Sequence, residues 1–190
     1  MAIRVAVDAM GGDNAPGAIV RGAVQALSDE ADLELVFVGD EGRIHKELSA
    51  VGADANKSRI RIVHASQVVG MDELPVEAVK TKKDSSLIRM AELAAAREVD
   101  AILSAGNTGA CAAVCQLKIK LFPCVARPGI AVTIPAFHGP FVLCDVGANI
   151  QAKPRHLYEY AIMATLYAQR VLGIKEPRVA VMSIGEESGK

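Results

Sequence analysis

The stretch Ile3-Arg-Val-Ala-Val7, followed at once by Asp8-Ala-Met-Gly-Gly-Asp-Asn-Ala-Pro16, decides the fold. It predicts an apolar strand that runs into a small, polar, glycine-rich loop and then a helix to about residue 27. In an open parallel sheet the carboxyl ends of the strands share one edge, and ligands bind in the crevice there. The same arrangement recurs along the chain, so we expect the strand-end clusters to meet at one polar site. The later clusters are Gly39-Asp40, Ser104-Ala-Gly-Asn-Thr-Gly109, Asp145-Val-Gly-Ala-Asn149 and Ser183-Ile-Gly-Glu-Glu187.

The hydrophobic pattern predicts further elements, mostly in alternating strand and helix order. Strands are expected at residues 33–38, 59–64, 101–104 (a buried strand) and 179–184, and helices at 43–50, from Ser85 or Ser86 to about 98, 108 to about 118, and 155–172. Residues 67–83 and 121–127 are expected to be irregular. Pro16 is expected in the first turn of the first helix, and Gly52 in the C-cap region of the helix at 43–50. Segments 130–134 and 141–144 flank a loop too short for a crossover helix, which predicts an antiparallel hairpin.

These elements together predict a three-layer α/β/α doubly wound fold with a mostly parallel sheet and one antiparallel hairpin. We find no linker or low-complexity tract, so residues 1–190 are expected to form a single α/β domain. The chain stops just after a predicted strand, inside a loop that looks functional. We therefore expect it to be a fragment of something longer.

Composition excludes several classes of protein. Of the 190 residues, 51% are hydrophobic and 23% are charged, which is typical of a globular domain. The net charge of -1 gives no general attraction to nucleic acid, so no nucleic-acid partner is expected. There is no run of about 18 apolar residues, and the N-terminus enters a strand at once, so we expect a cytoplasmic protein.

Cysteine and histidine spacing argues against a metal site, because no CxxC pair occurs and the four histidines are scattered. We interpret the four cysteines as small buried hydrophobic residues in a reducing compartment. No G-x-G-x-x-G run supports a nicotinamide site, and no cofactor is expected. The cysteines are Cys111, Cys115, Cys124 and Cys144.

The cluster Gly106-Asn-Thr-Gly109 lies between a predicted strand and a predicted helix. Backbone N–H groups at a helix N-terminus, with Asn107 or Thr108 adding side-chain donors, make an anion site. The alternative is a helix cap and a tight turn without a ligand.

Similar alternatives apply to the other clusters. Gly11 and Gly12 allow a ligand to approach the backbone. The alternative is that Asp13 or Asn14 only caps the next helix. Asp145 and Asn149 either orient ligand groups or serve turn chemistry. The group Lys80, Lys82 and Lys83 is either a solvated surface or the source of one lysine that neutralises phosphate.

Taken together, these segments resemble the PlsX family of bacterial phosphate acyltransferases. The segments occur in the order and spacing of that family over the whole chain, although residues 117–127 lack the family's Gly-rich loop. Members of that family are longer, so the resemblance implies that residues 1–190 are the N-terminal portion of a longer catalytic domain. The segments are Val7-Asp-Ala-Met-Gly-Gly-Asp-Asn-Ala-Pro16, Lys82-Lys-Asp-Ser-Ser86, Ser104-Ala-Gly-Asn-Thr-Gly-Ala110, Asp145-Val-Gly-Ala-Asn149, Val171-Leu-Gly-Ile174 and Ser183-Ile-Gly-Glu-Glu187.

The resemblance implies that a fatty acyl group passes from acyl-[acyl carrier protein] to inorganic phosphate, giving acyl phosphate for phospholipid synthesis. Phosphate is the nucleophile, so the chain would supply positioning and oxyanion stabilisation. The expected catalytic residues are Asn107, Thr108, Lys82, Asp145 and Lys190. The expected substrate- and phosphate-binding residues are Asp8, Gly11, Gly12, Asp13, Asn14, Gly106, Gly109, Asn149 and Glu186.

The resemblance also implies partners: acyl carrier protein as donor, inorganic phosphate, a second copy in a homodimer, and a membrane glycerol-3-phosphate acyltransferase of the PlsY type that takes the product. Peripheral contact with the inner face of the membrane is expected. Two other readings remain open. One is a phosphotransacetylase that uses acyl-coenzyme A, and the other is a non-catalytic scaffold that recruits lipid enzymes to the membrane.

Overall fold

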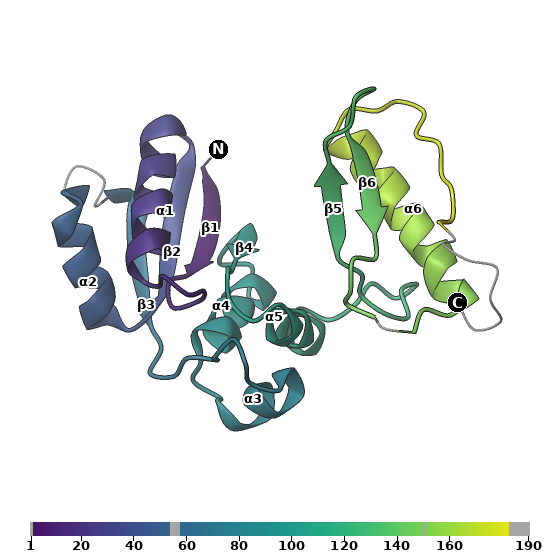
Figure 1. The fold of residues 1–190 in the computed structure, drawn as a ribbon. Helices are drawn as coiled ribbons and strands as arrows, with labels where there is room; N and C mark the ends of the chain where they lie inside the picture. Colours follow the sequence, from purple (N-terminus) through teal and green to yellow (C-terminus); the bar gives the residue numbers. More distant parts are fainter. Residues whose placement is uncertain (1, 54–57, 150, 183–190) are drawn as a thin grey trace. The chain divides into compact units, whose positions relative to one another are not determined.

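Four parallel strands form a sheet in the order β3-β2-β1-β4. The computed structural model of the chain describes residues 2–53, 58–149 and 151–182. Strand β1 lies inside the sheet because it pairs with both β2 and β4, with Val7 opposite Phe37 on one side and opposite Leu103 on the other. The strands, labelled in Figure 1, are β1 (Ile3–Asp8), β2 (Leu33–Gly39), β3 (Ile60–His64) and β4 (Ala101–Leu103).

Helices cover both faces of this sheet and give three layers (Figure 1). Side chains alternate across a strand, so Val7 faces one helical layer and Ala6 faces the other. The first face packs on α1 (Gly17–Asp29) and α2 (Glu41–Ala50). The second face packs on α3 (Pro75–Thr81), α4 (Ser86–Ala95) and α5 (Thr108–Val114), which continues as the π-helical turn η2 (Cys115–Ile119).

Local signals set the ends of several helices as expected. Ser85 is the N-cap of α4, and its hydroxyl accepts a hydrogen bond from the Ile88 N–H at 3.4 Å. Gly52 follows α2 with a φ of +64°, the left-handed conformation that favours glycine after a helix. Pro16 is the N-cap of α1 rather than a residue of its first turn, and no side chain caps that helix. Neither Asp13 nor Asn14 therefore serves as the cap.

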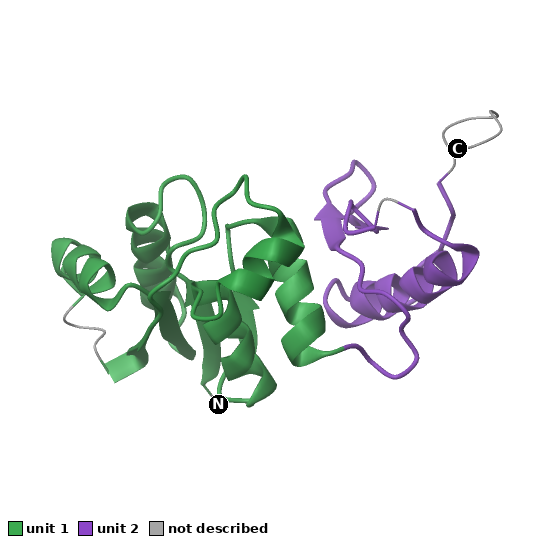
Figure 2. Ribbon diagram, turned by 90° about the horizontal axis from the view of Figure 1, so that it is seen from below, with its two compact units in different colours: residues 1–120 green, residues 121–190 purple. Residues whose placement is uncertain are grey.

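Residues 121–190 form a second compact unit, drawn in purple in Figure 2, where residues 1–120 are green. Its described residues contain an antiparallel hairpin of β5 (Ala131–Ile134) and β6 (Phe141–Cys144), followed by α6 (Pro154–Arg170). Tyr160 of α6 is 1% exposed. The parallel sheet between helices and the separate hairpin confirm the predicted α/β class. A single domain over the whole chain stays a prediction.

Four local predictions differ from the structure. Residues 75–81, expected to be irregular, form α3, a helix too short to show a hydrophobic period. Strand β4 was expected to be buried, but Leu103 is 59% exposed because β4 ends the described sheet. Residues 179–182 are irregular rather than a strand, and residues 183–184 lie outside the described part. Of the cysteines, Cys124 is exposed and the other three are half-buried.

No helix among the described residues is long and apolar enough to cross a membrane.

Candidate functional site

The ends of β1 and β4 meet through a buried carboxylate. Asp8, the last residue of β1, is 2% exposed. Its Oδ2 accepts a hydrogen bond from the Ser104 hydroxyl at 2.8 Å, and its Oδ1 accepts one from the Met10 N–H at 3.1 Å. Ser104 follows β4 directly, and its hydroxyl oxygen accepts from the Gly106 N–H at 3.1 Å. The two strand-end loops that the sequence singles out are thus joined by one chain of hydrogen bonds.

Two glycines allow these loops to approach each other. A Cβ at Gly11 would lie 2.8 Å from the Gly106 nitrogen and 2.5 Å from Asp8 Oδ2, closer than real Cβ atoms come. A Cβ at Gly106 would lie 3.2 Å from the Gly11 Cα. Gly12 has a φ of +100°, which an L side chain rarely adopts. Backbone packing is therefore one sufficient reason for glycine at these positions, whether or not a ligand binds.

Asn107 ties the loop after β4 to a distant segment. Its Oδ1 caps α5 by accepting from the Ala110 N–H at 2.9 Å. Its Nδ2 donates to the carbonyls of Gly70, Met71 and Glu73 at 3.1, 3.2 and 3.0 Å. The side chain is 7% exposed. Both amide hydrogens are thus engaged inside the protein, which makes Asn107 a residue that positions the loop and does not offer free donors.

The first residues of α5 are more open. Thr108 and Gly109 are exposed, and the backbone N–H groups of both lie in the first helical turn, ahead of the amide that Asn107 caps. No described group accepts a hydrogen bond from either N–H. A Cβ at Gly109 would lie 2.6 Å from the Pro75 side chain, so the start of α5 packs on the start of α3.

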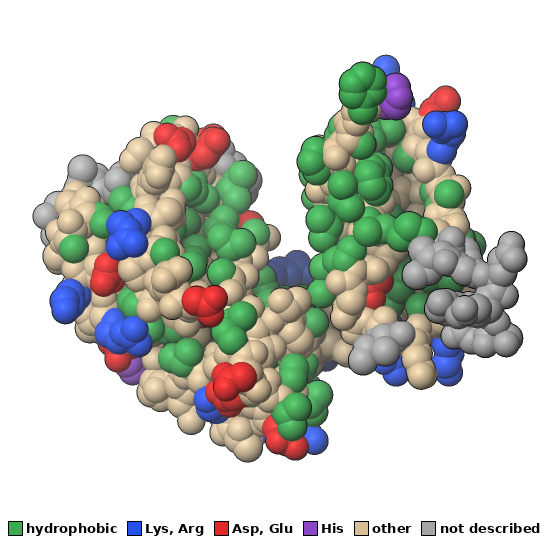
Figure 3. Space-filling view, in the orientation of Figure 1, with side chains coloured by type: hydrophobic (Ala, Val, Ile, Leu, Met, Phe, Trp, Pro, Cys, Tyr) green, Lys and Arg blue, Asp and Glu red, His purple; other side chains and the backbone are tan. Residues whose placement is uncertain are grey.

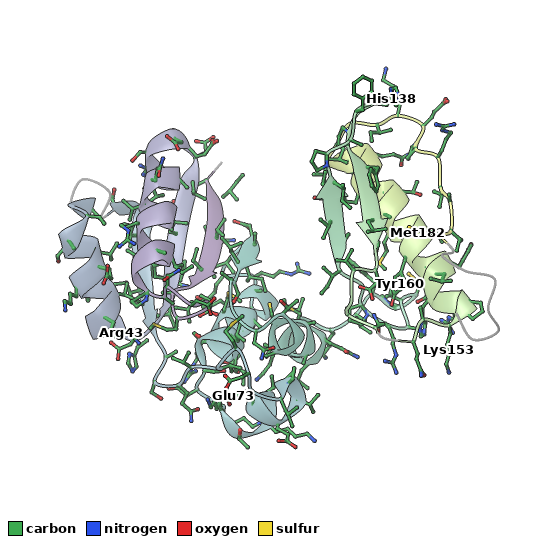
Figure 4. All side chains as sticks on the ribbon, in the orientation of Figure 1. Arg43, Glu73, His138, Lys153, Tyr160 and Met182 are labelled. Atoms are coloured by element: carbon green, nitrogen blue, oxygen red, sulfur yellow. The ribbon has the colours of Figure 1, made fainter. Side chains whose placement is uncertain are left out.

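Lys82 and Glu73 form the ion pair at the edge of this region. The Lys82 ammonium pairs with Glu73 and also donates to the Val68 carbonyl at 2.6 Å. Glu73 Oε1 accepts from the Gly70 N–H at 2.7 Å as well. The hydrogen bond from Lys82, and then that from Gly70, hold the pKa of Glu73 below its usual value. Figure 4 labels Glu73 in this region.

Asp84, in the same motif as Lys82, has a structural role. Asp84 accepts from the Ser66 hydroxyl at 2.6 Å, from the Ser66 N–H at 3.0 Å and from Arg89 Nε at 2.7 Å. The two bonds from Ser66 and the bond from Arg89 hold the pKa of Asp84 well below its usual range. Asp84 therefore fastens the end of β3 to the start of α4.

In the second unit, Asp145 and Asn149 hold the loop after the hairpin. Asp145 accepts from the N–H groups of Ile130 and Asn149, both at 2.8 Å. Asn149 Nδ2 donates to the Pro128 carbonyl at 2.7 Å and to the Tyr160 hydroxyl at 2.8 Å. Burial raises the pKa of Asp145, but the hydrogen bonds outweigh it and leave the pKa below its usual value. These contacts are the turn chemistry that the sequence left as an alternative.

Some predicted residues are not placed by these contacts. Asp13 and Asn14 are exposed in the loop before α1. Glu186 and Lys190 lie outside the described residues. The described part of the chain contains no group of three His, Cys, Asp or Glu residues able to hold a metal ion.

Sequence reasoning missed Glu73 and the segment around it. Pro75 was the available signal, because proline is common at the first position of a helix. A helix that begins there would have indicated that the residues just before it, including Glu73, are ordered. A second missed feature is the thiol pair on α5 and η2. A hydrogen bond from Cys111 lowers the pKa of Cys115 to about 7, and the same bond raises the pKa of Cys111.

Comparison with known proteins supplies the family. A family model described as "Fatty acid synthesis protein" matches residues 3–190. The chain is 43% identical over 190 residues, its whole length, to the phosphate acyltransferase of Magnetococcus marinus, and covers 54% of that protein. Over 189 residues it is 42% identical to the phosphate acyltransferase of Bacillus licheniformis, with 99% of this chain and 56% of the relative covered. Over 188 residues it is 44% identical to the phosphate acyltransferase of Heliobacterium modesticaldum, with 99% of this chain and 56% of the relative covered.

The chain thus spans about half the length of the curated relatives it matches. The match includes the loops after β1 and β4, where Asp8, Ser104 and the paired glycines meet, and it extends through the hairpin and α6 of the second unit. Because the similarity runs through every described element, the chain belongs to the fatty acid synthesis protein family, as the resemblance to the PlsX phosphate acyltransferases predicted.

Proposed function

We propose that the protein transfers a fatty acyl group from acyl-[acyl carrier protein] to inorganic phosphate, and so supplies acyl phosphate for phosphatidic acid synthesis. The observation that carries the proposal is the identity of 43% to a phosphate acyltransferase over the whole chain. The polar junction at the ends of β1 and β4 supports it, since ligands of parallel sheets bind at that edge.

The chemistry suits a site without a nucleophilic side chain. A phosphate oxygen attacks the thioester carbonyl carbon, a C–O bond forms, the C–S bond breaks, and the carrier leaves as a thiol that takes the proton of hydrogenphosphate. The protein must hold the anion against the carbonyl and stabilise the developing oxyanion, which positioned N–H groups do without a base of their own.

Within the first unit, the open N–H groups of Thr108 and Gly109 would bind phosphate. Asn107 would fix their orientation through its cap and its hold on the segment before α3. Gly11 and Gly12, with Asn14 and Asp13, would line the thioester side. Lys82, drawn toward Glu73, would add positive charge near the anion.

Asp8 would orient Ser104 and, through it, Gly106. In the second unit, Asp145 and Asn149 would keep the loop after β6 in a single conformation. Roles for Glu186 and Lys190 stay predictions from the resemblance.

We further propose that the protein acts as a homodimer in the cytoplasm, with peripheral contact at the inner face of the membrane. Acyl phosphate is a reactive mixed anhydride, so a membrane glycerol-3-phosphate acyltransferase of the PlsY type would consume it there. These partners rest on the family resemblance.

The test is phosphate-dependent release of free carrier thiol from acyl-[acyl carrier protein], measured with this chain and with the longer Bacillus licheniformis relative in parallel. Activity in both would place the catalytic set within this chain. Activity of the relative alone would show that the longer protein completes the site. Cleavage of acyl-coenzyme A but not of the carrier thioester would favour a phosphotransacetylase, and carrier binding without any cleavage would favour a scaffold.

A pair of variants tests the phosphate cradle. Thr108→Pro removes the N–H and the hydroxyl, and proline is tolerated at the first helical position. The preceding residue has φ -59° and ψ 107°, the extended conformation that a following proline requires. Thr108→Ala removes the hydroxyl alone, so the difference between the two variants reports the N–H. We expect Thr108→Pro to raise the KM for phosphate about tenfold over Thr108→Ala, the worth of one charge-assisted hydrogen bond. Equal KM values would remove this N–H from the site.

A further inference from the structure

Exposed charge on the described residues of the second unit is almost entirely positive. In the described residues 121–149 and 151–182, all basic side chains are exposed, whereas Asp145 is half-buried and Glu159 is buried. Glu176 is the single exposed acid of that part. The exposed bases are Arg127, Lys153, Arg155, Arg170, Lys175 and Arg178.

Three of these bases gather at the N-terminal end of α6. Lys153 is the N-cap of the helix and Arg155 lies in its first turn. Glu159 joins Arg155 to the preceding loop, because its carboxylate accepts from Arg155 Nε at 2.7 Å and from the Ala126 N–H at 2.7 Å. Arg127 therefore lies beside the same turn. Figure 3 shows Lys and Arg side chains at this lower end of the second unit, where Figure 4 labels Lys153.

Positive charge at this end of α6 does not stabilise the helix. The N-terminal end of a helix carries partial positive charge and prefers acidic neighbours, yet the first turn of α6 contains no acidic residue. Arg155 is paired with Glu159, but neither Lys153 nor Arg127 forms an ion pair with a described residue. Stability therefore does not account for two of the three positive charges.

Apolar side chains stand next to the cations. Leu157 is 39% exposed and Tyr158 is 68% exposed. Lys153 and Leu157 are four residues apart on α6, and Arg155 and Tyr158 are three apart, so each pair shares a helix face. Aromatic side chains and arginine are enriched at protein interfaces. We call Arg127, Lys153, Arg155, Leu157 and Tyr158 the basic patch.

We propose that the basic patch docks an acidic surface of a protein partner. The inference rests on the proposed function, in which the acyl donor is itself carried by a protein, and it predicts that the carrier meets the patch through acidic side chains. Charge complementarity of this kind steers encounter and orients the partner. A membrane is the less favoured occupant, because anionic lipid recognition uses clusters of about four to eight basic residues.

The test is the affinity of holo-acyl carrier protein for this chain, measured by calorimetric titration. The patch variant is Arg127→Glu with Lys153→Glu, which leaves the Arg155–Glu159 pair intact and places an acid where the helix favours one. The matched control is Lys175→Glu with Arg178→Glu, which changes the net charge by the same amount beyond the other end of α6.

We expect the patch variant to bind the carrier about tenfold more weakly and the control to bind within about twofold of wild type, as for charges at the edge of an interface. Wild-type affinity should also fall between about 20 and 300 mM salt, since the screening length drops below about 10 Å in that range. Absent carrier binding, equal binding by all three proteins, or equal losses in both variants would overturn the proposal. So would vesicles of phosphatidylglycerol that bind the patch in place of the carrier.

A small thioester separates this proposal from the proposed function. Phosphate-dependent cleavage of S-acyl-pantetheine needs no carrier surface. If that cleavage occurs and the patch variant still binds the carrier normally, the function stands and the docking surface fails. If cleavage is absent both in this chain and in the Bacillus licheniformis relative but carrier binding depends on the patch, the docking surface stands and the proposed catalysis fails.

Discussion

Substitution of Asn107 by alanine should loosen the segment before α3 without touching the core. The side chain is 7% exposed and makes four hydrogen bonds, one to the N–H of Ala110 and three to carbonyls of the segment from Gly70 to Glu73. Alanine removes all of them at once. The sequence alone predicts a variant that loses turnover without unfolding, and the structure adds a loss of stability.

The magnitude follows from two contributions. Loss of a helix N-cap costs about 1 kcal/mol. The two amide hydrogens supply the equivalent of two neutral hydrogen bonds, each worth about 1 kcal/mol net. The free energy of unfolding should therefore fall by about 3 kcal/mol for Asn107→Ala. Asn107→Ser keeps a good capping hydroxyl but cannot span to the carbonyls, so it should lose about 2 kcal/mol.

The assay is urea unfolding followed by circular dichroism, together with hydrogen exchange of the amides in residues 70–82. With a denaturant slope of about 2 kcal/mol per molar, the midpoint of Asn107→Ala should drop by about 1.5 M. Asn14→Ala is the control, because Asn14 is exposed and should change stability by less than about 0.5 kcal/mol. An Asn107→Ala midpoint equal to that of the control, with unchanged exchange, would show that Asn107 does not hold the segment before α3.

Three further outcomes are expected. Gly11→Ala should lower the melting temperature strongly, since its Cβ has no room, whereas Gly22→Ala, with nothing within 4 Å, should raise it slightly; equal shifts would contradict the close approach. Arg4 lowers the pKa of Asp100 to about 2, so this pair contributes stability above the unfolded pKa of about 3.9 that is lost as the pH falls toward 2. Arg4→Met should reduce this loss of unfolding free energy at acid pH, measured by equilibrium unfolding, and an unchanged pH dependence would count against the pair. The thiol of Cys115 has a pKa of about 7, so its rate of reaction with iodoacetamide, followed by peptide mass spectrometry, should rise with pH around a midpoint near 7. A midpoint near 9 would show a thiol without the hydrogen bond from Cys111.

Most of the fold could be predicted because its signals are local. The loop between the predicted hairpin strands was too short for a helix, and β5 and β6 are antiparallel. Ser85 and Gly52 marked helix ends where the structure has them. The recurrence of polar clusters after apolar runs predicted that Asp8 and Ser104 would lie close together, and they share a hydrogen bond.

The remainder depends on contacts between distant residues. Asn107 was expected to offer its amide to a ligand, but carbonyls more than thirty residues earlier in the chain accept from it. Nothing in the sequence identifies Glu73 as the partner of Lys82. Helix α3 has seven residues with two buried side chains, too few to show a period. Local pattern thus placed the polar edge of the sheet but not the side chains that brace it.

The position of β1 inside the sheet has a consequence for synthesis of the chain. Strand β1 must wait for its partner β4, because β4 is made much later and the Asp8–Ser104 hydrogen bond at the ends of the two strands spans 96 residues. At roughly 5–20 residues per second, the ribosome needs about 5 to 20 seconds to deliver that partner. Until then, the nascent chain holds β1 against β2 alone, with one side of its backbone unpaired. This interval is when a chaperone or a neighbouring nascent chain would meet that strand.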